Sequence, residues 1–311
     1  MNKLVKVTIM LIFGLWVAAC SAPAPTQATI STPAPDETAL APTDPVSQTE
    51  PSATNPPPTP TATPLPVAFT VNGEPIAQAR YRAELDRFQA ALGEDIPLEE
   101  ASTRVLDMYV NQILLAQAAT AQGFSLTQEM VDVRINTLVA ELGDQAQFDV
   151  WLAENGFTLE QFREELALQI PAAWMRDQIL AEAPTSGEQV RARHILVRTE
   201  AEAQRVLAQL NSGTSFDVLL TVYDPIALGE LGWFPRGYIF QPELEDIAFA
   251  LDVETYSDII ATELGYHVLQ TTDRADNRPF SPDVLLFVQQ QTLENWLREK
   301  RSQSSIDILL P

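Results

Sequence analysis

The two histidines are the side chains best suited to chemistry near neutral pH, because imidazole changes its charge there. They are the only histidines among 311 residues. His194 stands beside the apolar triplet 195–197 and His267 beside Val268 and Leu269, and both patterns predict strands. A histidine in a strand is most often structural. On neighbouring antiparallel strands, however, the two rings would come within hydrogen-bonding distance, and each would fix the tautomer of the other.

Metal and nucleophilic chemistry have little support in this sequence. The single cysteine, Cys20, excludes an internal disulfide framework and a zinc site built from cysteines, and two histidines are too few for a histidine-rich metal site. No serine or cysteine with motif-like surroundings accompanies the histidines, which argues against covalent catalysis. We therefore expect no metal and no cofactor.

The first twenty residues have the pattern of an export signal. Lys3 and Lys6 precede an almost continuous apolar run, residues 7–17, which is too short to span a membrane. The sequence Val-Ala-Ala-Cys that follows resembles the lipobox of bacterial lipoproteins. We therefore predict a signal peptide over residues 1–19 and a lipid anchor on Cys20, which places the protein on the extracytoplasmic face of a bacterial membrane. The alternative is an ordinary signal peptide with an incidental cysteine.

Residues 20–66 are predicted to be a disordered stalk. Of the 23 prolines, 13 fall between Ser21 and Pro66, and this stretch contains no lysine or arginine and almost no large apolar side chain. Such a sequence cannot bury enough surface to offset its ordering entropy. In a polyproline II conformation, at ~3.1 Å per residue, it could extend on the order of 140 Å from the bilayer.

The charge balance bears on the choice of partner. The chain has 42 acidic and 19 basic residues, which gives a formal net charge of −23. Contacts to phosphate are made chiefly by Lys and Arg. The composition therefore argues against a nucleic-acid partner.

Residues 67–187 have the periodicity of helices. After a short strand-like segment, Ala68 to Val71, apolar residues recur at every third or fourth position. Ser125 and Thr158 are each followed three residues later by glutamine, which is the spacing of a capping box at a helix start. No cluster of chemically competent side chains lies in this region. We expect an all-helical domain whose apolar stripes form its core.

The pattern changes at residue 188, and residues 188–274 predict a small α+β domain with an antiparallel sheet. The predicted strands are Val190–Arg198, Ser257–Thr262 and Gly265–Thr272, and the predicted helices are Glu200–Leu210, Ser215–Tyr223 and Pro242–Leu251. The glycines of the segment 229–237 indicate a loop. Residues 275–311 form a C-terminal segment whose helix, Pro282–Arg301, is expected to pack on the helical domain.

Four motifs, in this order, resemble those of the parvulin family of peptidyl-prolyl isomerases. They are Arg-His-Ile-Leu-Val at 193–197, Gly-Glu-Leu-Gly-Trp-Phe-Pro-Arg-Gly at 229–237, Pro-Glu-Leu-Glu-Asp-Ile-Ala-Phe-Ala-Leu at 242–251 and Leu-Gly-Tyr-His-Val-Leu at 264–269. The helical region, beginning with Val-Asn-Gly-Glu-Pro-Ile at 71–76, resembles the chaperone part of SurA- and PrsA-type foldases. The resemblance implies a parvulin fold and isomerisation of X-Pro bonds in unfolded or partly folded exported polypeptides. It also implies attachment to a membrane through the lipid anchor.

The same resemblance implies which residues form the site. The implied catalytic residues are His194, His267 and Asp224, and the implied substrate-binding residues, which line or adjoin the proline pocket, are Leu231, Phe234, Ile239 and Leu244. In parvulins the pocket excludes water from the proline ring, and nearby polar groups act on the twisted peptide bond.

The segment 223–230 departs from the parvulin pattern. It reads Tyr-Asp-Pro-Ile-Ala-Leu-Gly-Glu, so it lacks the serine of the usual Tyr-Ser-x-Asp and is several residues shorter. Two functions therefore remain open. One is an active isomerase that assists folding. The other is a non-catalytic chaperone or peptide-binding protein with a degenerate parvulin domain. A purely structural stalked surface protein would leave the four motifs unexplained.

Overall fold

The structure is a computed structural model that describes residues 66–92 and 96–310. The predicted signal peptide, Cys20 and the stalk up to residue 65 lie outside the described residues. The chain divides into two compact units, and each is described by itself. The first holds residues 66–69, 75–92, 96–105 and 308–310, and the second holds residues 70–74 and 106–307. Within the described ranges, no helix is both long enough and apolar enough to span a bilayer.

The first unit is built on helix α2 (Gln78–Leu92) and the first two turns of helix α3 (Leu98–Ala121). Tyr81 joins these helices because its hydroxyl lies 2.7 Å from the hydroxyl of Ser102 and donates to the Ser102 carbonyl at 3.0 Å. The Tyr81 ring also meets Phe69 edge to face, with centroids 6.0 Å apart. Both aromatic rings are buried, so this contact forms the centre of the unit.

In the second unit, α3 is followed by helices α4 (Gln128–Leu142), α5 (Gln145–Glu154) and α6 (Leu159–Ala181). The capping box predicted at Thr158 is confirmed, because its side chain accepts from the Gln161 N–H at 3.1 Å and the Gln161 side chain accepts from the Thr158 N–H at 3.0 Å. The one predicted at Ser125 is wrong. Helix α4 begins at Gln128, and its N-cap is Thr127.

Helix α10 (Pro282–Ser302) packs against α6 within the second unit. Leu293, Trp296 and Leu297 of α10 lie on a buried apolar cluster that includes Met175 and Ile179 of α6. Arg301, at the end of α10, also donates to the side chains of Asn111 and Asp107 on α3. The C-terminal helix is therefore held by apolar packing along its length and by charged hydrogen bonds at its end.

A three-stranded sheet, in the order β2-β1-β7, accompanies the helices. Strands β1 (Val67–Val71) and β2 (Glu74–Ala77) form a hairpin over Asn72 and Gly73, whose φ values of 52° and 83° fit the turn that an Asn-Gly pair favours. The sequence predicted β1 but neither β2 nor the C-terminal strand β7 (Ile306–Ile308). The expected all-helical domain is thus mainly helical with a small sheet.

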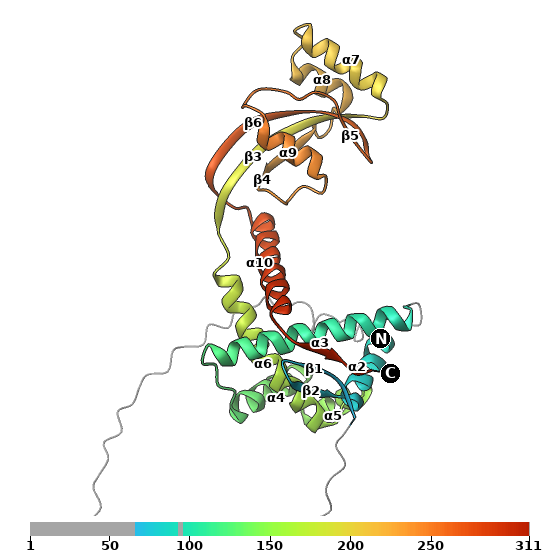
Figure 1. Cartoon of the computed structure of the whole chain (residues 1–311), viewed down its shortest axis with the longest axis vertical. Coiled ribbons are helices and arrows are strands. Elements are labelled where there is room, and N and C mark those ends of the chain that lie inside the picture. The colour runs from blue at the N-terminus through green and yellow to red at the C-terminus, as the bar shows by residue number, and fades with distance from the viewer. Residues whose placement is uncertain (1–65, 93–95, 311) are drawn as a thin grey trace, which may run out of the picture. The chain divides into compact units, whose positions relative to one another are not determined.

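The α+β domain has a four-stranded antiparallel sheet in the order β4-β3-β6-β5 (Figure 1). Its strands are β3 (Ser186–Val197), β4 (Glu230–Phe234), β5 (Ile260–Thr262) and β6 (Gly265–Pro279). Helices α7 (Glu200–Asn211) and α8 (Phe216–Tyr223) pack on one face, where they bury Ile195, Val197 and Val268. Helix α9 (Pro242–Ala250) covers the other face, where Ala192, Phe234 and Leu269 are buried.

Three details of this domain differ from the sequence predictions. The predicted loop 229–237 contains strand β4, which pairs with β3 from Val190 to Arg193. The predicted strand Ser257–Thr262 is regular only from Ile260, although Tyr256 forms an isolated bridge to Gln270. Of the two central strands, β3 begins before its predicted start at Val190, and β6 continues past its predicted end at Thr272. The two strands pair as far as Ser186 and Pro279.

Candidate active site

The two imidazoles lie side by side on the central strands of the α+β sheet. In the β3–β6 register, Leu196 is opposite His267 and His194 is opposite Leu269, so the two histidines are diagonal neighbours on one face. Their Nδ1 atoms are 3.1 Å apart and their ring centroids 4.9 Å apart. The paired site predicted from the strand pattern is therefore confirmed in its geometry. One ring must donate through Nδ1–H while the other accepts, which makes their tautomers complementary.

His267 is enclosed and His194 is partly open. His267 has no exposed surface, and its Nε2 atom lies 2.9 Å from the hydroxyl of Thr262. That hydroxyl also accepts from the N–H of Leu264 at 3.1 Å, which fixes its position in the tight β5–β6 connection. Thr262 was not selected from the sequence. The signal for it is a hydroxyl at the end of the apolar run 259–261, just before the strand that carries His267.

Both imidazoles are held neutral at pH 7. Burial, and secondarily the neighbouring His194, lower the pKa of His267 from its ordinary 6.5 to about 4. Burial also lowers the pKa of His194, and the carboxylate of Asp224 opposes that shift. A neutral pair keeps one donor and one acceptor facing each other, which two imidazolium rings could not do.

Asp224 closes the short loop that leads to strand β4. Its carboxylate accepts from the N–H of Ala227 at 3.1 Å and from the N–H of Gly229 at 2.9 Å. These backbone hydrogen bonds, that of Gly229 first, hold the pKa of Asp224 below its usual value. The carbonyl of Gly229 in turn accepts from the N–H of His194 at 2.9 Å. Asp224 therefore fixes the loop against strand β3 and places a negative charge near His194.

The four apolar residues implied for the substrate pocket share one cluster with helix α9 but differ in exposure. Leu231 and Ile239 are partly exposed and pack against the cluster from outside. Leu244 is 1% exposed and Phe234 is fully buried, with the Phe234 ring edge to face on Phe249 at 6.1 Å. A ligand can therefore touch Leu231 and Ile239 directly, whereas Leu244 and Phe234 support that surface from beneath. Phe234 ends strand β4 and is not part of a loop, contrary to the sequence prediction.

A buried carboxylate positions Ile239. Glu245, near the start of α9, is 8% exposed and accepts from the N–H of Gly237 at 2.7 Å and of Ile239 at 3.3 Å. These bonds tie the turn after β4 to the helix and set the direction of the Ile239 side chain. The sequence suggested no role for Glu245, since an acidic residue in the first turn of a helix is commonly a response to the helix dipole.

The described residues offer no obvious metal centre. Within residues 66–92 and 96–310, no three His, Cys, Asp or Glu side chains are grouped so that they could hold an ion. The side chains brought together here are the imidazole pair, the neighbouring carboxylate of Asp224 and an apolar wall formed by Leu231 and Ile239.

Comparison with known protein families decides the identity of both parts. Residues 184–281 match the PPIC-type PPIase domain, and residues 58–175 match the SurA-like N-terminal domain. The chain combines a SurA-like N-terminal domain with a parvulin domain. The histidine pair, the Asp224 loop and the apolar wall all belong to the parvulin domain.

Several relatives align with this chain over most of their length. The foldase protein PrsA of Halalkalibacterium halodurans is 27% identical over 242 residues, covering 69% of this chain and 72% of the relative. The foldase protein PrsA of Geobacillus kaustophilus is 29% identical over 210 residues, covering 63% of this chain and 73% of the relative. A crystal structure of the peptidylprolyl isomerase PrsA from Bacillus cereus is 22% identical, with a TM-score of 0.44, and covers 73% of this chain and 86% of that chain.

Proposed function

We propose that this protein is an extracytoplasmic foldase whose parvulin domain catalyses cis–trans isomerisation of X-Pro bonds in exported polypeptides. The observation that carries the proposal is the 3.1 Å contact between His194 and His267 beside the apolar wall of Leu231 and Ile239. The relatives named foldase support the same reading. The helical domain and α10 would hold unfolded or partly folded clients while their prolyl bonds equilibrate.

The reaction needs a shaped and dry surface more than a nucleophile. Rotation about an amide bond has a barrier near 20 kcal/mol because resonance is lost when the bond twists. An enzyme accelerates the rotation by binding the twisted amide more tightly than the planar one. Water favours the planar, dipolar form. A proline ring seated against Leu231 and Ile239 would lose that water, which brings the planar amide closer in free energy to the twisted one.

We base the proposed role of each polar side chain on its exposure. His194 is the member of the pair that a bound peptide can reach, so it is the proposed catalytic residue. His267 has no exposed surface and acts through His194 as a positioning residue. Thr262 fixes His267 from the other side. Asp224 places its negative charge near His194 and holds the loop 224–229 in position.

The attachment to a membrane is a separate part of the proposal. Cys20 follows Val-Ala-Ala, so a diacylated lipid joined to its thiol through a thioether would anchor the chain on the extracytoplasmic side of a bacterial membrane. The proline-rich segment 20–66 would then separate the folded domains from the bilayer.

The alternative is a client-binding protein without catalysis. Two observations favour it: Asp224 uses its carboxylate for the backbone of its own loop, and Leu244 has almost no surface left for a substrate. In that case the parvulin domain would recognise peptides and leave their isomerisation rate unchanged.

NMR exchange spectroscopy on a proline-containing tetrapeptide separates the two functions. With catalytic amounts of the intact protein, we expect the cis–trans exchange rate to rise well above that of the free peptide. His194→Ala should remove most of the increase, whereas Arg198→Ala, at an exposed position just after strand β3, should leave it in place. If the folded wild-type protein does not change the exchange rate, the binding protein replaces the enzyme as the explanation.

A further inference from the structure

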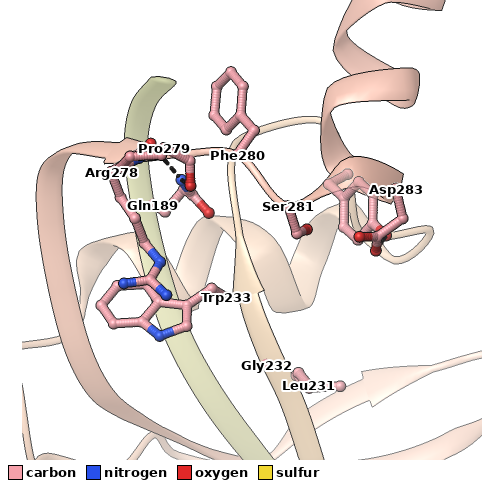
Figure 2. A pocket seen from close by; sticks show the side chains of 10 residues that line it. Gln189, Leu231, Gly232, Trp233, Arg278, Pro279, Phe280, Ser281 and Asp283 are labelled. Atoms are coloured by element: carbon pink, nitrogen blue, oxygen red, sulfur yellow. Dashed lines mark hydrogen bonds between the residues drawn. The ribbon is translucent and has the colours of Figure 1, made fainter. Parts of the chain in front are cut away.

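A cleft of about 410 Å³ opens in the parvulin domain beside the proposed proline pocket (Figure 2). It lies among the first residues of β3, strand β4, the end of β6 and the start of α10. The side chains that define it are Gln189, Leu231, Trp233, Tyr238, Arg278 and Asp283. None of the roles proposed above uses this cleft, although Leu231 lines it.

Gln189 presents a side-chain hydrogen-bond acceptor to the cleft. The residue is 1% exposed, and its Nε2 atom donates to the carbonyl of Arg278 at 2.8 Å. That bond fixes the orientation of the amide, and no hydrogen bond to Oε1 occurs within the described residues. Figure 2 shows the amide turned toward the space between Trp233 and Ser281. Because Nε2 is engaged by the Arg278 carbonyl and the amide faces this space, Oε1 is placed to accept from a donor that enters the cleft.

Arg278 supplies donors at the same place. Its guanidinium lies over the Trp233 ring, 4.3 Å from the ring centroid, and within the described part of the chain it forms no ion pair. The stacking uses the face of the guanidinium and leaves the N–H groups at its edge free to reach an oxygen. Tyr238, which also lines the cleft, donates to Asp283 at 2.9 Å, and this bond fixes the position of its aromatic ring.

The cleft is continuous with the proposed proline pocket. Leu231 and Tyr238 line the cleft, and both also pack, as Ile239 does, against the buried apolar cluster that contains Leu244. Leu231 and Trp233 are two residues apart in strand β4, a separation of roughly 7 Å at the usual rise per residue. A chain bound with its proline ring on Leu231 would therefore enter the cleft within a few residues.

We propose that this cleft binds the main chain of the client segment next to the X-Pro bond, in an extended conformation. The proposal rests on the function proposed above and names a second part of the same substrate site. Gln189 Oε1 accepts a client N–H, Arg278 donates to a client carbonyl, and Trp233 with Tyr238 provides apolar surface for one side chain. Recognition through main-chain groups gives affinity with little dependence on sequence, which suits a foldase with many clients.

The charge pattern distinguishes a peptide from other ligands. One arginine and one aspartate line the cleft, so it offers no excess of cations for a phosphate or another anion. The aspartate already accepts the Tyr238 hydroxyl. A neutral amide, with its donor and acceptor a few ångströms apart, matches the unpaired acceptor of Gln189 and the free donors of Arg278, which both lie near the Trp233 ring.

The test compares peptides of different length on the intact protein. One probe is a tetrapeptide with a central X-Pro bond, and two others carry four added residues on the amino or the carboxyl side. Isomerisation kinetics give KM for each, and the indole N–H resonance of Trp233 reports occupation of the cleft. We expect one of the long peptides to have a KM on the order of tenfold lower than the tetrapeptide and to shift the Trp233 resonance.

Arg278→Met, which keeps an apolar side chain over Trp233, and Gln189→Leu should each reduce this length effect to less than twofold. Arg236→Met is the matched control, because Arg236 also stacks on an aromatic ring, Phe249 at 4.2 Å, but does not line the cleft. The ratio of KM values within each variant cancels a general loss of activity.

Equal KM values for all three peptides in the wild type, or an unchanged ratio in both cleft variants, would overturn the proposal while leaving the isomerase function intact. If no peptide is isomerised but the long peptide still shifts Trp233 in an Arg278-dependent way, the cleft holds and the enzymatic proposal fails.

Discussion

The backbone of Gly229 lies directly against the backbone of His194. The N–H of His194 donates to the Gly229 carbonyl at 2.9 Å, and a Cβ atom on Gly229 would overlap the His194 carbonyl oxygen and approach Leu220 Cδ2 to 2.8 Å. Gly229 also has φ at 61°, a conformation that side chains disfavour. The short loop therefore depends on a residue without a side chain in order to close beside strand β3, which carries His194.

Gly229→Ala should destabilise the parvulin domain more than the same change at another glycine with positive φ. Gly213, with φ at 95°, is the matched control, since a Cβ atom there would meet nothing within 4 Å. We expect about 1–2 kcal/mol of lost stability at Gly213 from backbone strain and roughly 1–3 kcal/mol more at Gly229 from the overlap. Denaturant unfolding of both variants measures the difference. Equal losses would show that the loop can move away from His194.

The stability of the domain should fall as the pH is lowered from about 6.5 toward 4. The folded pKa of His267 is about 4, below the unfolded value near 6.5, so the unfolded state binds more protons in this window. The stabilisation is complete above the unfolded pKa, and it is lost at a slope of up to about 1.4 kcal/mol per pH unit for one fully coupled histidine. Unfolding free energies measured across the window should show a smaller slope for His267→Gln. The same slope in both proteins would mean that His267 titrates normally.

Thr262→Val should lower the isomerisation rate by removing the hydroxyl that faces His267 Nε2. The change is nearly isosteric, so the effect on rate reports the orientation of the imidazole pair more than a loss of packing. We expect a decrease in kcat/KM on the order of tenfold, together with a loss of about 1 kcal/mol in stability. Thr262→Ser should restore most of the rate. Thr272→Val is the control, because that hydroxyl bonds only to the Arg191 carbonyl at 3.2 Å, within the described residues. A rate unchanged in Thr262→Val would remove Thr262 from the network.

Leu231→Ala should reduce catalysis because it opens the apolar wall to water. Leu251 packs on the same buried cluster from the end of α9 and does not line the cleft, so Leu251→Ala controls for the loss of buried apolar area. We expect kcat/KM to fall about tenfold for Leu231→Ala and less than threefold for Leu251→Ala, with both variants still unfolding cooperatively. Similar losses in the two variants would show that only the stability of the cluster matters.

Cys20→Ala should abolish labelling of the protein by a fatty-acid analogue in a bacterial host and release it from the membrane fraction. The reason is that Cys20 is the only thiol in the chain, so no other residue can carry a thioether-linked anchor. Ser21→Ala, next to it, should leave both labelling and fractionation unchanged. Labelling that persists in Cys20→Ala would contradict the lipobox interpretation.

The sequence predicted the histidine pair because strands have a simple geometry. Alternation placed His194 and His267 on strands, and two strands of one small sheet bring such rings together when they are neighbours. Strand β4 was missed because its own sequence does not indicate a strand. Its flanking and internal glycines, Gly229, Gly232 and Gly237, indicate a loop, and only pairing with β3 makes the segment extended.

Other parts of the site depend on contacts between distant residues, which no local pattern encodes. Thr262 matters only because His267 turns Nε2 toward it, and Glu245 matters only because the turn at Gly237 folds back over the start of α9. The difference in exposure between Leu231, which is partly exposed, and Leu244, which is buried, likewise follows from how α9 packs on the sheet. Motif resemblance located these apolar residues, whereas their accessibility required the structure.

The pairing of Ser186 with Pro279 brings the entrance and the exit of the parvulin domain together. Because the two ends are neighbours, the whole domain is an insertion between α6 and α10. The surrounding chain therefore loses little loop-closure entropy when the domain is present. Such an inserted domain can be lengthened, exchanged or deleted in evolution without a break in the chain that surrounds it. A descendant that lost the parvulin domain would need only a short turn between two helices to keep its helical part continuous.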